Sequence, residues 1–206
     1  AVLLAAADGT QRVLPYPDAE LTRLDINEGS TVTLRDHRLA KAAHKVYFTR
    51  HGETVWNVEN KICGMTDSPL TENGRAQARE LGEKLRTSGL RIDEIRFSPL
   101  SRAADTARAI AEATGIPARC EPRLREQCFG RYEGTPRNGE EFRISKTHFA
   151  DRYSGGESMM QLAQRSYNLL DELRADTDKT FLLVAHNGIA REVQSYFYAM
   201  TNEEYV

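Results

Sequence analysis

The chain has 206 residues, of which 28 are basic and 30 acidic, so its formal net charge at pH 7 is −2. This length predicts one domain or one domain with an appendage, and it is long enough to bury a sizeable core. With 40% hydrophobic and 28% charged residues, the composition is that of a soluble globular protein and excludes disordered, fibrous and membrane-embedded classes. The nearly balanced charge also argues against nucleic acid or an acidic membrane surface as a general partner.

The start of the chain and its cysteines bear on the compartment. The apolar run Ala1–Ala7 is far shorter than a membrane-spanning helix and has no basic flank before it, so we expect neither a signal peptide nor a membrane segment. Cys63, Cys120 and Cys128 are odd in number and lack paired C-x-x-C spacing. This pattern fits a reducing compartment better than a disulfide framework or a zinc site. The sequence therefore predicts a cytoplasmic protein.

Residues 1–44 are expected to form an N-terminal extension. The turn signals Pro15–Asp18 and Asn27–Ser30 surround short alternating stretches such as Thr31–Leu34, a pattern that predicts a hairpin followed by a helical turn near Leu39. Three placements stay open: the extension could add to an edge of the sheet, lie over a cap, or bridge the subunits of a homodimer.

From Lys45 onward the pattern alternates between strands and helices. Val46–Thr49 is β-branched and aromatic and ends abruptly at Arg50-His51-Gly52, which predicts a buried strand followed by a loop. Thr71 is expected to be the N-cap of the next helix, because an apolar stripe at helical spacing follows it.

Two further helices carry start signals. After a second predicted strand, Ile92–Phe97, Ser98 is expected to be an N-cap with Pro99 at the first helical position. Gly115 is expected to end this helix. The string Ser158-Met159-Met160-Gln161 matches a capping box and predicts the start of another helix.

Phe181–Ala185 is an apolar run without polar alternation, as is typical of a central strand covered on both faces. Strands that alternate with helices predict a three-layer α/β/α sandwich with a mostly parallel central sheet. In such sheets ligands bind at the carboxyl ends of the strands. His51 and His186 each follow a predicted strand, so both imidazoles are expected at the same edge.

Arg50-His51-Gly52-Glu53-Thr54 is the most informative string in the chain. A guanidinium group binds phosphate oxygens through two parallel hydrogen bonds, and a glycine lets the backbone approach an anion closely. Similar elements follow the other predicted strands, in Ser98–Arg102 and in His186–Gly188. Together these strings point to a phosphate-binding site.

Six strings between Lys45 and Tyr198 carry a family resemblance. They are Arg50-His51-Gly52-Glu53-Thr54 with Asn57, Gly64–Gly74, Ser98–Ala103, Leu124–Gly134, Gly155–Ser158 and Ala185–Gly188. In this order they resemble the histidine phosphatase superfamily, also called the phosphoglycerate mutase-like family, whereas an isolated Arg-His-Gly would match many unrelated proteins. The resemblance implies the sandwich fold and a catalytic domain that spans 45–206.

The resemblance implies that His51 is the nucleophile that takes the phosphoryl group and becomes a phosphohistidine. This is sound chemistry, because neutral imidazole is nucleophilic near pH 7 and a phospho-enzyme divides one transfer into two easier ones. Arg50, Arg102 and His186 resemble the family's phosphate pocket, with Asn57 as a hydrogen-bond donor. A transferring phosphoryl group spreads negative charge over three oxygens, so fixed cations and donors stabilise it.

The resemblance also implies that Glu126 is the general acid toward the leaving oxygen. An adjacent phosphate dianion would favour its protonated form by like-charge repulsion. Cys63, Gly64, Asn187 and Gly188 lie in or beside the matching strings and are expected to bind the substrate. No metal or other cofactor is implied, because imidazole and arginine supply the nucleophile and the positive charge. The expected partner is a small phosphorylated substrate.

Two departures from the family favour hydrolysis over transfer. In the cofactor-dependent mutases, Arg, His and Tyr usually follow the general acid and help to hold a carboxylate, whereas this chain has Gln127-Cys128-Phe129. The mutases also usually carry a longer insertion than the one between Gly134 and Glu157. A site without a clamp for a second acidic group leaves water as the acceptor, so we favour a phosphatase. A phosphoglycerate mutase and a non-catalytic phospho-ligand binding or scaffold protein are the alternatives.

The segment Phe142–Tyr153 is expected to form a cap over the pocket and to hold the substrate specificity. The basic residues of this segment, and one just before it, could contact an acidic substrate. A run of basic residues more commonly indicates a loop or helix face that is exposed to solvent. The basic residues are Arg137, Arg143, Lys146, His148 and Arg152. Four glutamates in the matching strings are expected to be helix caps and supports: Glu53, Glu72, Glu133 and Glu157.

Overall fold

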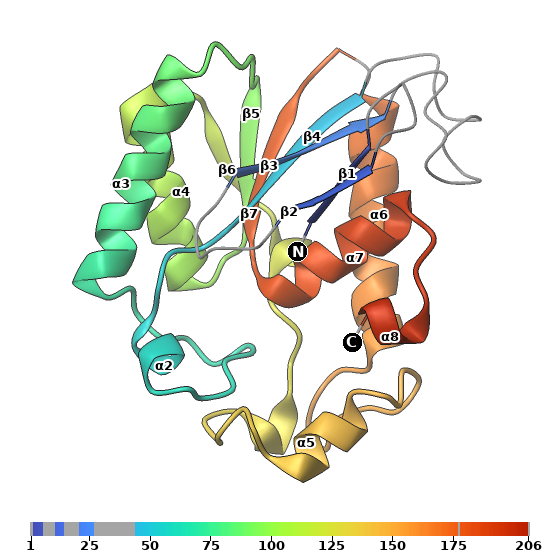
Figure 1. Ribbon diagram of the computed structural model, residues 1–206. Coiled ribbons are helices and arrows are strands. Elements are labelled where there is room, and N and C mark those ends of the chain that lie inside the picture. Colours follow the sequence, from blue (N-terminus) through green and yellow to red (C-terminus); the bar gives the residue numbers. More distant parts are fainter. Residues whose placement is uncertain (1, 6–10, 15–20, 27–43, 177, 206) are drawn as a thin grey trace.

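The computed structural model describes residues 2–5, 11–14, 21–26, 44–176 and 178–205, with side chains from residue 46 onward. Its main sheet has the strand order β3-β4-β7-β5-β6 and is covered by helices on both faces (Figure 1). The strands are β3 (Leu21–Ile26), β4 (His44–Arg50), β5 (Glu94–Phe97), β6 (Ala118–Cys120) and β7 (Phe181–Ala185). Apart from β3, which runs antiparallel to β4, neighbouring strands pair in parallel. The predicted α/β/α sandwich is confirmed.

The described parts of the N-terminal 44 residues contribute β-structure. β1 (Val2–Ala5) and β2 (Gln11–Leu14) pair antiparallel in a small sheet of their own. β3 extends the main sheet at the β4 edge. The stretch Thr31–Leu34 and the helical turn expected near Leu39 lie outside the described residues. The division into an extension and a catalytic domain stays a prediction.

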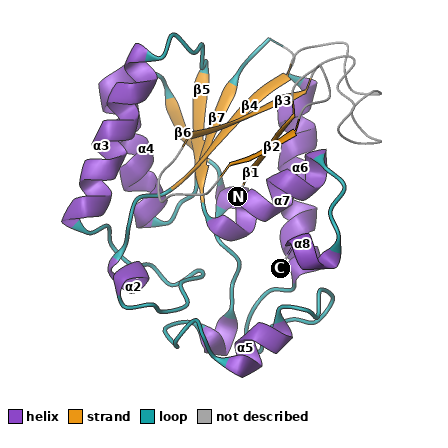
Figure 2. Cartoon of the chain, viewed as in Figure 1, coloured by secondary structure: helices purple, strands orange, loops and turns teal. Residues whose placement is uncertain are grey.

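The helices form the two outer layers of the sandwich (Figure 2). The longer ones are α3 (Glu72–Thr87), α4 (Ser101–Thr114), α6 (Met159–Ala175) and α7 (Asn187–Phe197). The short ones are α2 (Val55–Val58), η1 (Pro122–Leu124), η2 (Gly130–Tyr132), α5 (Glu140–Ser145) and α8 (Asn202–Tyr205). α3 and α4 lie on one face of the sheet, and α6 and α7 lie on the other (Figure 1). Within the described residues, none of these helices is long and apolar enough to cross a membrane.

The position of β7 at the centre of the sheet explains its apolar sequence. All five of its residues are buried. Leu183 and Ala185 pack with side chains of α6 and α7, whereas Leu182 and Val184 pack with side chains of α3 and α4. Because successive side chains of a strand point to opposite faces, both faces of β7 must be apolar. Each fully buried leucine contributes about 1.5–3 kcal/mol relative to an exposed one.

Two of the predicted helix starts are confirmed. Thr71 is the N-cap of α3, where its hydroxyl oxygen accepts a hydrogen bond from the Gly74 N–H at 3.0 Å. Ser158 and Gln161 form the capping box of α6. Gly115 ends α4 with a φ of 73°, in the left-handed region that favours glycine.

The predicted start of α4 is wrong by two residues. The N-cap is Leu100, which makes no side-chain cap bond, and the helix begins at Ser101. Ser98 is not the N-cap: its hydroxyl lies 2.7 Å from the His186 Nε2 atom and accepts a hydrogen bond at 3.3 Å from the N–H of Leu100, which precedes the helix. Pro99 is therefore part of the connection between β5 and α4.

A cap, residues 129–154, lies below the carboxyl ends of the strands and contains η2 and α5 (Figure 1). It has a hydrophobic cluster of its own, separate from the two clusters that flank the sheet. Its members are Ile62, Phe129, Phe142 and Tyr153, with Tyr132 packed against them. The cap is tied to the loop after α2 by backbone hydrogen bonds, one of them from the Ile62 N–H to the Thr135 carbonyl at 2.8 Å. The segment expected to cover the pocket thus folds as a small unit against this loop.

Candidate active site

The two predicted histidines meet at the carboxyl ends of adjacent strands. Arg50, at the end of β4, lies in register with Ala185, at the end of β7. The His51 N–H donates to the Ala185 carbonyl at 3.1 Å. The imidazole rings of His51 and His186 lie with centroids 5.2 Å apart and planes inclined by 57°. Strand pairing therefore positions these two side chains side by side.

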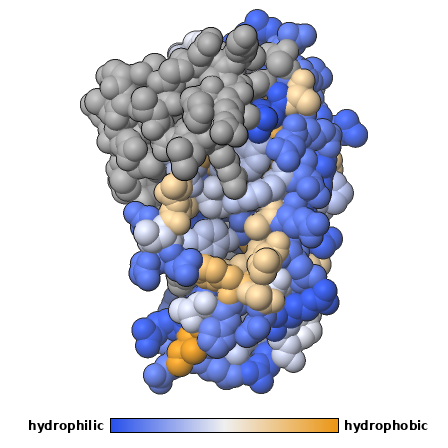
Figure 3. All heavy atoms as spheres, turned by 90° about the vertical axis from the view of Figure 1, so that its right-hand side faces the viewer, coloured by the Kyte–Doolittle hydropathy of each residue, from blue (hydrophilic) through white to orange (hydrophobic). Residues whose placement is uncertain are grey.

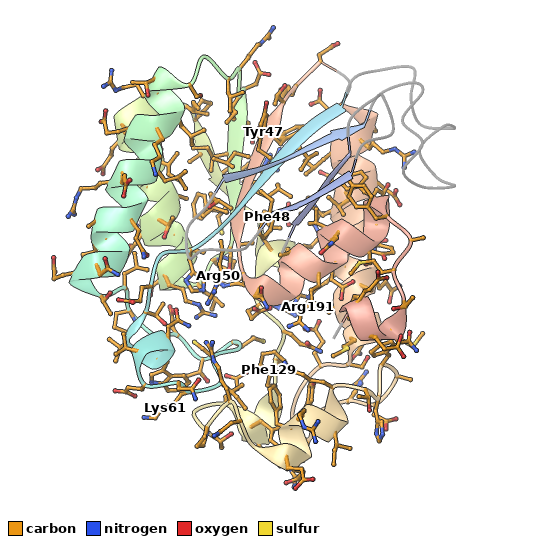
Figure 4. The ribbon with its side chains drawn as sticks, in the orientation of Figure 1. Tyr47, Phe48, Arg50, Lys61, Phe129 and Arg191 are labelled. Atoms are coloured by element: carbon orange, nitrogen blue, oxygen red, sulfur yellow. The ribbon has the colours of Figure 1, made fainter. Side chains whose placement is uncertain are left out.

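A cavity of about 200 Å³ lies between this edge of the sheet and the cap. It is lined by Arg50, His51, Asn57, Ile62, Cys63, Glu126, Phe129, Arg137, Phe142, Lys146, Asn187 and Arg191. Figure 4 shows Arg50 and Arg191 on the side of the sheet and of α7, with Phe129 facing them from the cap. The volume is below the 300–1,000 Å³ typical of pockets for drug-sized ligands, so the cavity suits a small molecule.

His51 is held in one tautomer. Its side chain is only 5% exposed, and its Nδ1 atom lies 2.7 Å from the Gly52 carbonyl oxygen. Because a carbonyl oxygen can only accept, Nδ1 must carry the proton, and the lone pair of the neutral ring is on Nε2. Burial, followed by the charges of Arg50 and Arg102, holds the pKa of His51 well below its ordinary value. The ring is thus neutral at physiological pH, in the form that a nucleophile requires.

Gly52 is required for close packing of the loop that carries His51. A Cβ atom at this position would lie 2.3 Å from the Gly74 carbonyl oxygen. The Gly52 N–H donates to the Thr106 hydroxyl at 3.1 Å. The glycine therefore allows the loop that carries His51 to lie directly on the first turn of α3.

His186 lies behind His51 and does not line the cavity. It is fully buried, and its Nε2 atom lies 2.7 Å from the Ser98 hydroxyl. Its Nδ1 atom is buried and has no hydrogen-bond partner among the described residues. Burial, followed by the charges of Arg102 and of the His51 side chain, holds the pKa of His186 well below its ordinary value. Two neutral imidazoles are thus packed together beside the cavity.

Arg102 and Gly64 also lie outside the cavity lining. The Arg102 side chain is 1% exposed and donates to the carbonyl oxygens of Gly64 at 2.6 Å and Thr66 at 3.2 Å, and to the Asp67 carboxylate at 3.3 Å. Its position at a helix start is therefore explained by loop acceptors, where the sequence suggested a bound anion. Gly64 is needed for close packing, because a Cβ atom there would lie 2.4 Å from the Gln127 carbonyl oxygen.

Glu126 faces the cavity with a fixed carboxyl group. Its Oε1 atom accepts a hydrogen bond from the Gln127 N–H at 2.8 Å, and its Oε2 atom accepts one from the Gly188 N–H at 3.1 Å. The side chain is 5% exposed. Gly188 supports Glu126 rather than lining the cavity, because its missing side chain leaves the space that the carboxyl group occupies.

Arg165 supports the backbone at Glu126 and was not singled out from the sequence. Its guanidinium forms two hydrogen bonds with the Glu157 carboxylate, at 2.8 and 2.9 Å, and a third with the Glu126 carbonyl at 3.2 Å. Glu157 is thus a support, as expected, and Glu133 is another, since it accepts hydrogen bonds from three backbone N–H groups. Glu53 accepts from the Thr71 hydroxyl, and Glu72 lies in the first turn of α3.

Asn57, Cys63 and Asn187, which are expected to bind the substrate, line the cavity. The Asn57 side-chain oxygen accepts from the Thr54 N–H at 3.0 Å, which leaves its NH2 group for a ligand. Asn187 is the first residue of α7, whose N-cap makes no side-chain hydrogen bond. A helix N-terminus of this kind favours an anion. The pKa of the Cys63 thiol is raised, chiefly by burial, so this side chain is a neutral thiol.

Three further cations line the cavity: Arg137, Lys146 and Arg191. The cavity therefore holds cations besides Arg50, and the expectation that the site lacks a clamp for a second acidic group, which rested on Gln127-Cys128-Phe129, stays a prediction. Arg137 and Lys146 were among the basic residues predicted near the cap, whereas Arg191 was missed. The spacing from Asn187 to Arg191 could have indicated it, because residues four apart lie on one face of a helix.

The other basic residues of the cap segment lie elsewhere. Arg143, His148 and Arg152 do not line the cavity, and His148 lies 3.3 Å from the Asp151 carboxylate. Among the described residues, no group of three His, Cys, Asp or Glu side chains is arranged to hold a metal ion. The cavity's own donors are guanidinium, ammonium and amide groups, which suit an anion.

A larger cavity of about 440 Å³ lies between α6, α7 and α8 and contains none of the predicted site residues. Its lining is mostly apolar and includes Phe149, Met159, Met160 and Tyr205. Figure 3 looks onto this side of the molecule and shows apolar residues gathered below its centre. Size alone therefore does not identify the active site; the smaller cavity is the one that holds reactive side chains.

Comparison with known proteins agrees with the assignment of the smaller cavity as the candidate active site. The family model of the histidine phosphatase superfamily (branch 1) matches residues 46–205. The "Probable phosphoglycerate mutase GpmB" of Enterobacter sp. (strain 638) is 42% identical over 154 residues, which are 71% of this chain and 70% of that protein. The protein of the same name from Yersinia pestis (strain Pestoides F) is 38% identical over 150 residues, 69% of either chain.

Solved structures show the same fold. A mycobacterial glucosyl-3-phosphoglycerate phosphatase is 32% identical, has a TM-score of 0.64 and is matched over 72% of this chain and 77% of its own. Bacillus stearothermophilus YhfR is also 32% identical, with a TM-score of 0.62 over 73% of this chain and 77% of its own. From the sheet-edge histidines, the family match and these likenesses together, we conclude that the chain belongs to branch 1 of the histidine phosphatase superfamily.

Proposed function

We propose that this protein is a metal-independent phosphomonoester hydrolase that acts on a small phosphorylated molecule through a phosphohistidine at His51. The observation that carries the proposal is the hydrogen bond from His51 Nδ1 to the Gly52 carbonyl. It leaves the lone pair on Nε2, in a neutral ring that lines a cavity with several cations. The same proposal includes a cytoplasmic location and a substrate that is neither nucleic acid nor membrane. A homodimer is the assembly that the proposal allows.

In the first step, the phosphoryl group binds to the Arg50 guanidinium, the Asn57 NH2 group and the start of α7 at Asn187. The Nε2 atom of His51 attacks phosphorus, and the bond from phosphorus to the leaving oxygen breaks. Glu126 gives its proton to that oxygen, so the alcohol leaves neutral. The donors stabilise the charge on the three equatorial oxygens in the transition state.

In the second step, water attacks the phosphohistidine. The Glu126 carboxylate takes a proton from the water, the bond from phosphorus to Nε2 breaks, and the electron pair returns to the ring. The reaction regenerates neutral His51 and releases inorganic phosphate. Arg102 and His186 act through their neighbours: the Arg102 charge favours the neutral ring of His51, and His186 fixes its orientation by packing.

The likeness to the mycobacterial glucosyl-3-phosphoglycerate phosphatase supports hydrolysis, and that protein was solved with VO3, an analogue of phosphate. A phosphoglycerate mutase is the second candidate, because the most similar curated relatives reported above carry that name and because the cavity holds further cations. A phospho-ligand binding protein is the third candidate, although binding alone would not require a neutral nucleophile beside a fixed carboxyl group.

Hydrolysis of p-nitrophenyl phosphate in the presence of EDTA tests the proposal, with transfer between phosphoglycerates assayed in parallel. We expect phosphate release by the wild type, none by His51→Ala, and a trapped phosphohistidine visible by mass spectrometry. Metal dependence, or full activity of His51→Ala, would contradict the mechanism. Transfer that exceeds hydrolysis would establish the mutase, and tight phosphate binding without turnover would establish the binding protein.

A further inference from the structure

The larger cavity, of about 440 Å³, is separate from the reactive centre. It shares no lining residue with the smaller cavity. α7 contributes to both: Asn187 and Arg191 line the smaller cavity, whereas Glu192 and Ser195 line the larger one. The volume is within the range of roughly 300–1,000 Å³ that is typical of pockets for small organic ligands. The larger cavity is therefore a candidate for a second binding site.

Most of the lining of the larger cavity is apolar. Phe149 and three methionines, Met159, Met160 and Met200, line it together with tyrosine side chains. Met160 is 62% exposed, so the cavity reaches the surface of the molecule at this side chain, on the face that Figure 3 shows. Methionine side chains are flexible and adapt to apolar molecules of different shapes. This lining suits the hydrocarbon part of a ligand.

Glu192 gives this apolar cavity a negative charge. Among the described residues that line the cavity, it is the single one with a charged side chain. The Glu192 side chain is fully buried, and its Oε2 atom has no hydrogen-bond partner among the described residues. The hydroxyl oxygens of Tyr167 and Ser195 lie 2.7 Å apart and bond to each other. A buried carboxylate that lacks donors is costly, because it has lost the water that would solvate it.

The nearest cations do not pair with Glu192. Burial raises the pKa of Glu192 to about 7, although the Tyr205 hydrogen bond and the charges of Arg191 and Arg165 act in the opposite direction. Neither arginine forms an ion pair with this carboxylate in the described part of the chain, and Arg165 pairs with Glu157 at 2.8 Å instead. A carboxyl group with a displaced pKa in an apolar cavity is typical of a functional site.

Tyr205 shows that an aromatic group with a hydrogen-bond donor fits beside Glu192. The Tyr205 hydroxyl donates to the Glu192 Oε1 atom, and the Tyr205 ring packs on Phe149 with ring centroids 5.4 Å apart. Tyr205 belongs to the short helix α8 and is partly exposed. The Glu192 Oε2 atom is itself covered, so a ligand reaches the carboxyl group when the Tyr205 side chain shifts.

We propose that the larger cavity binds a small organic amine, whose apolar body lies against Phe149 and the methionines and whose ammonium group donates to the Glu192 carboxylate. An ammonium group supplies both a compensating charge and up to three donors. A neutral alcohol supplies a donor without the charge, and an anion is repelled. The proposal concerns a site apart from His51 and does not depend on the proposed hydrolase activity.

Isothermal titration calorimetry on the whole chain at pH 8 compares three ligands with the same apolar body: 4-phenylbutylamine, 4-phenylbutan-1-ol and 4-phenylbutanoate. At this pH the alkylammonium group is charged, as a lysine side chain is. We expect the amine to bind about tenfold or more tightly than the alcohol, because hydrogen bonds to charged groups are worth roughly this factor. The carboxylate should bind more weakly than the alcohol. Equal affinities for the three ligands, or no binding of the amine, would overturn the proposal.

The variant Glu192→Gln removes the charge and keeps the shape of the side chain. It should lower the affinity for the amine about tenfold or more and leave the affinity for the alcohol nearly unchanged. Glu203→Gln removes an exposed carboxylate of α8 that does not line the cavity, and this matched control should bind the amine as the wild type does. Undiminished binding of the amine by Glu192→Gln would overturn the proposal.

Two further measurements test the place of the amine. Tyr205→Phe keeps the ring on Phe149 and removes the hydroxyl that competes for Glu192, so it should bind the amine more tightly than the wild type. Inorganic phosphate, an anion suited to the cations of the smaller cavity, should not displace the amine. Weaker binding by Tyr205→Phe, or displacement by phosphate, would contradict binding at Glu192.

Discussion

Gly188 and the carboxyl group of Glu126 are in direct contact: the glycine N–H donates to Oε2 at 3.1 Å, and a Cβ atom on the glycine would lie 2.3 Å from Oε1. The first turn of α7 thus sets the position of the proposed general acid. Glycine is the residue that leaves this space free for the Glu126 carboxyl group. The backbone at Glu126 is itself held by Arg165, whose guanidinium donates to the Glu126 carbonyl oxygen.

The variant Gly188→Ala is expected to displace the Glu126 carboxyl group and to lower kcat for alkyl phosphates by about tenfold or more, because a proton donor must lie within hydrogen-bond reach of the leaving oxygen. Steady-state kinetics with glycerol 3-phosphate measure this loss. Ala190→Gly, on the same helix but outside the cavity lining, is the control for a general effect on α7. An active Gly188→Ala enzyme would show that Glu126 need not be placed so exactly.

Replacement of Glu126 by glutamine removes the proton donor and keeps the shape of the side chain. We expect a loss of about 10²–10⁴-fold in kcat for alkyl phosphates, the usual contribution of general acid catalysis. For 2,4-dinitrophenyl phosphate, whose leaving group needs no proton, the loss should be much smaller. Equal losses with both substrates would assign Glu126 a role in binding and not in proton transfer.

The binding of an anionic substrate in the cavity is expected to weaken as the pH rises above about 8, because Lys146 lines the cavity. The pKa of Lys146 is lowered to about 8, so this side chain is charged below that pH and neutral above it. The charged groups that act on it are Arg191, Arg137 and Glu126, and only the loss of the lysine charge removes a cation in this range. KM for glycerol 3-phosphate should therefore rise between pH 7 and pH 9.

The matched variant for this pH effect is Lys146→Arg, which keeps the charge at all pH values because arginine does not titrate in this range. Its KM for glycerol 3-phosphate should be flat over the same interval. A wild-type KM that is independent of pH would show that Lys146 does not contact the substrate.

His51 is expected to stay neutral at pH values where an ordinary histidine is protonated. Its pKa lies well below 6.5, chiefly because of burial, so protonation should not remove the nucleophile between pH 6 and pH 7. Nitrogen-15 NMR of the imidazole measures this directly and should show the proton on Nδ1 at pH 6. A ring that titrates near pH 6.5 would contradict the prediction.

Ser98→Ala is expected to destabilise the fold by about 1–3 kcal/mol, the cost of leaving a buried polar group without its partner. The Ser98 hydroxyl is the hydrogen-bond partner of the His186 Nε2 atom, and the Nδ1 atom of this ring has no partner among the described residues. Urea denaturation measures the change. Ser154→Ala, at an exposed position, should change the free energy of unfolding by less than about 0.5 kcal/mol.

The features that sequence predicts well are those whose causes lie within a few residues. The apolar run of β7, the N-cap at Thr71 and the capping box at Ser158 each depend on neighbouring positions, and the structure has all three. The start of α4 was misplaced because Ser98 bonds to His186, which is 88 residues away. Local cap preferences cannot include that contact.

The same limit applies to the site. Arg50 and His51 lie at the end of a recognisable strand, so their place in the cavity could be predicted. Arg102 bonds to loop carbonyls 36 and 38 residues away, and this folding of the chain back on itself removes it from the cavity lining. Arg191 contributes a cation that no string of the family indicates, because its role depends on how α7 lies against the cap.

The separate hydrophobic cluster of the cap has a consequence for how specificity can change. Because Phe129, Phe142 and Tyr153 pack mainly on one another and not on the clusters beside the sheet, exchanges in the cap disturb a small core and leave the packing around His51 and His186 intact. New substrates can thus evolve through the cap at little cost to the stability of the reactive centre.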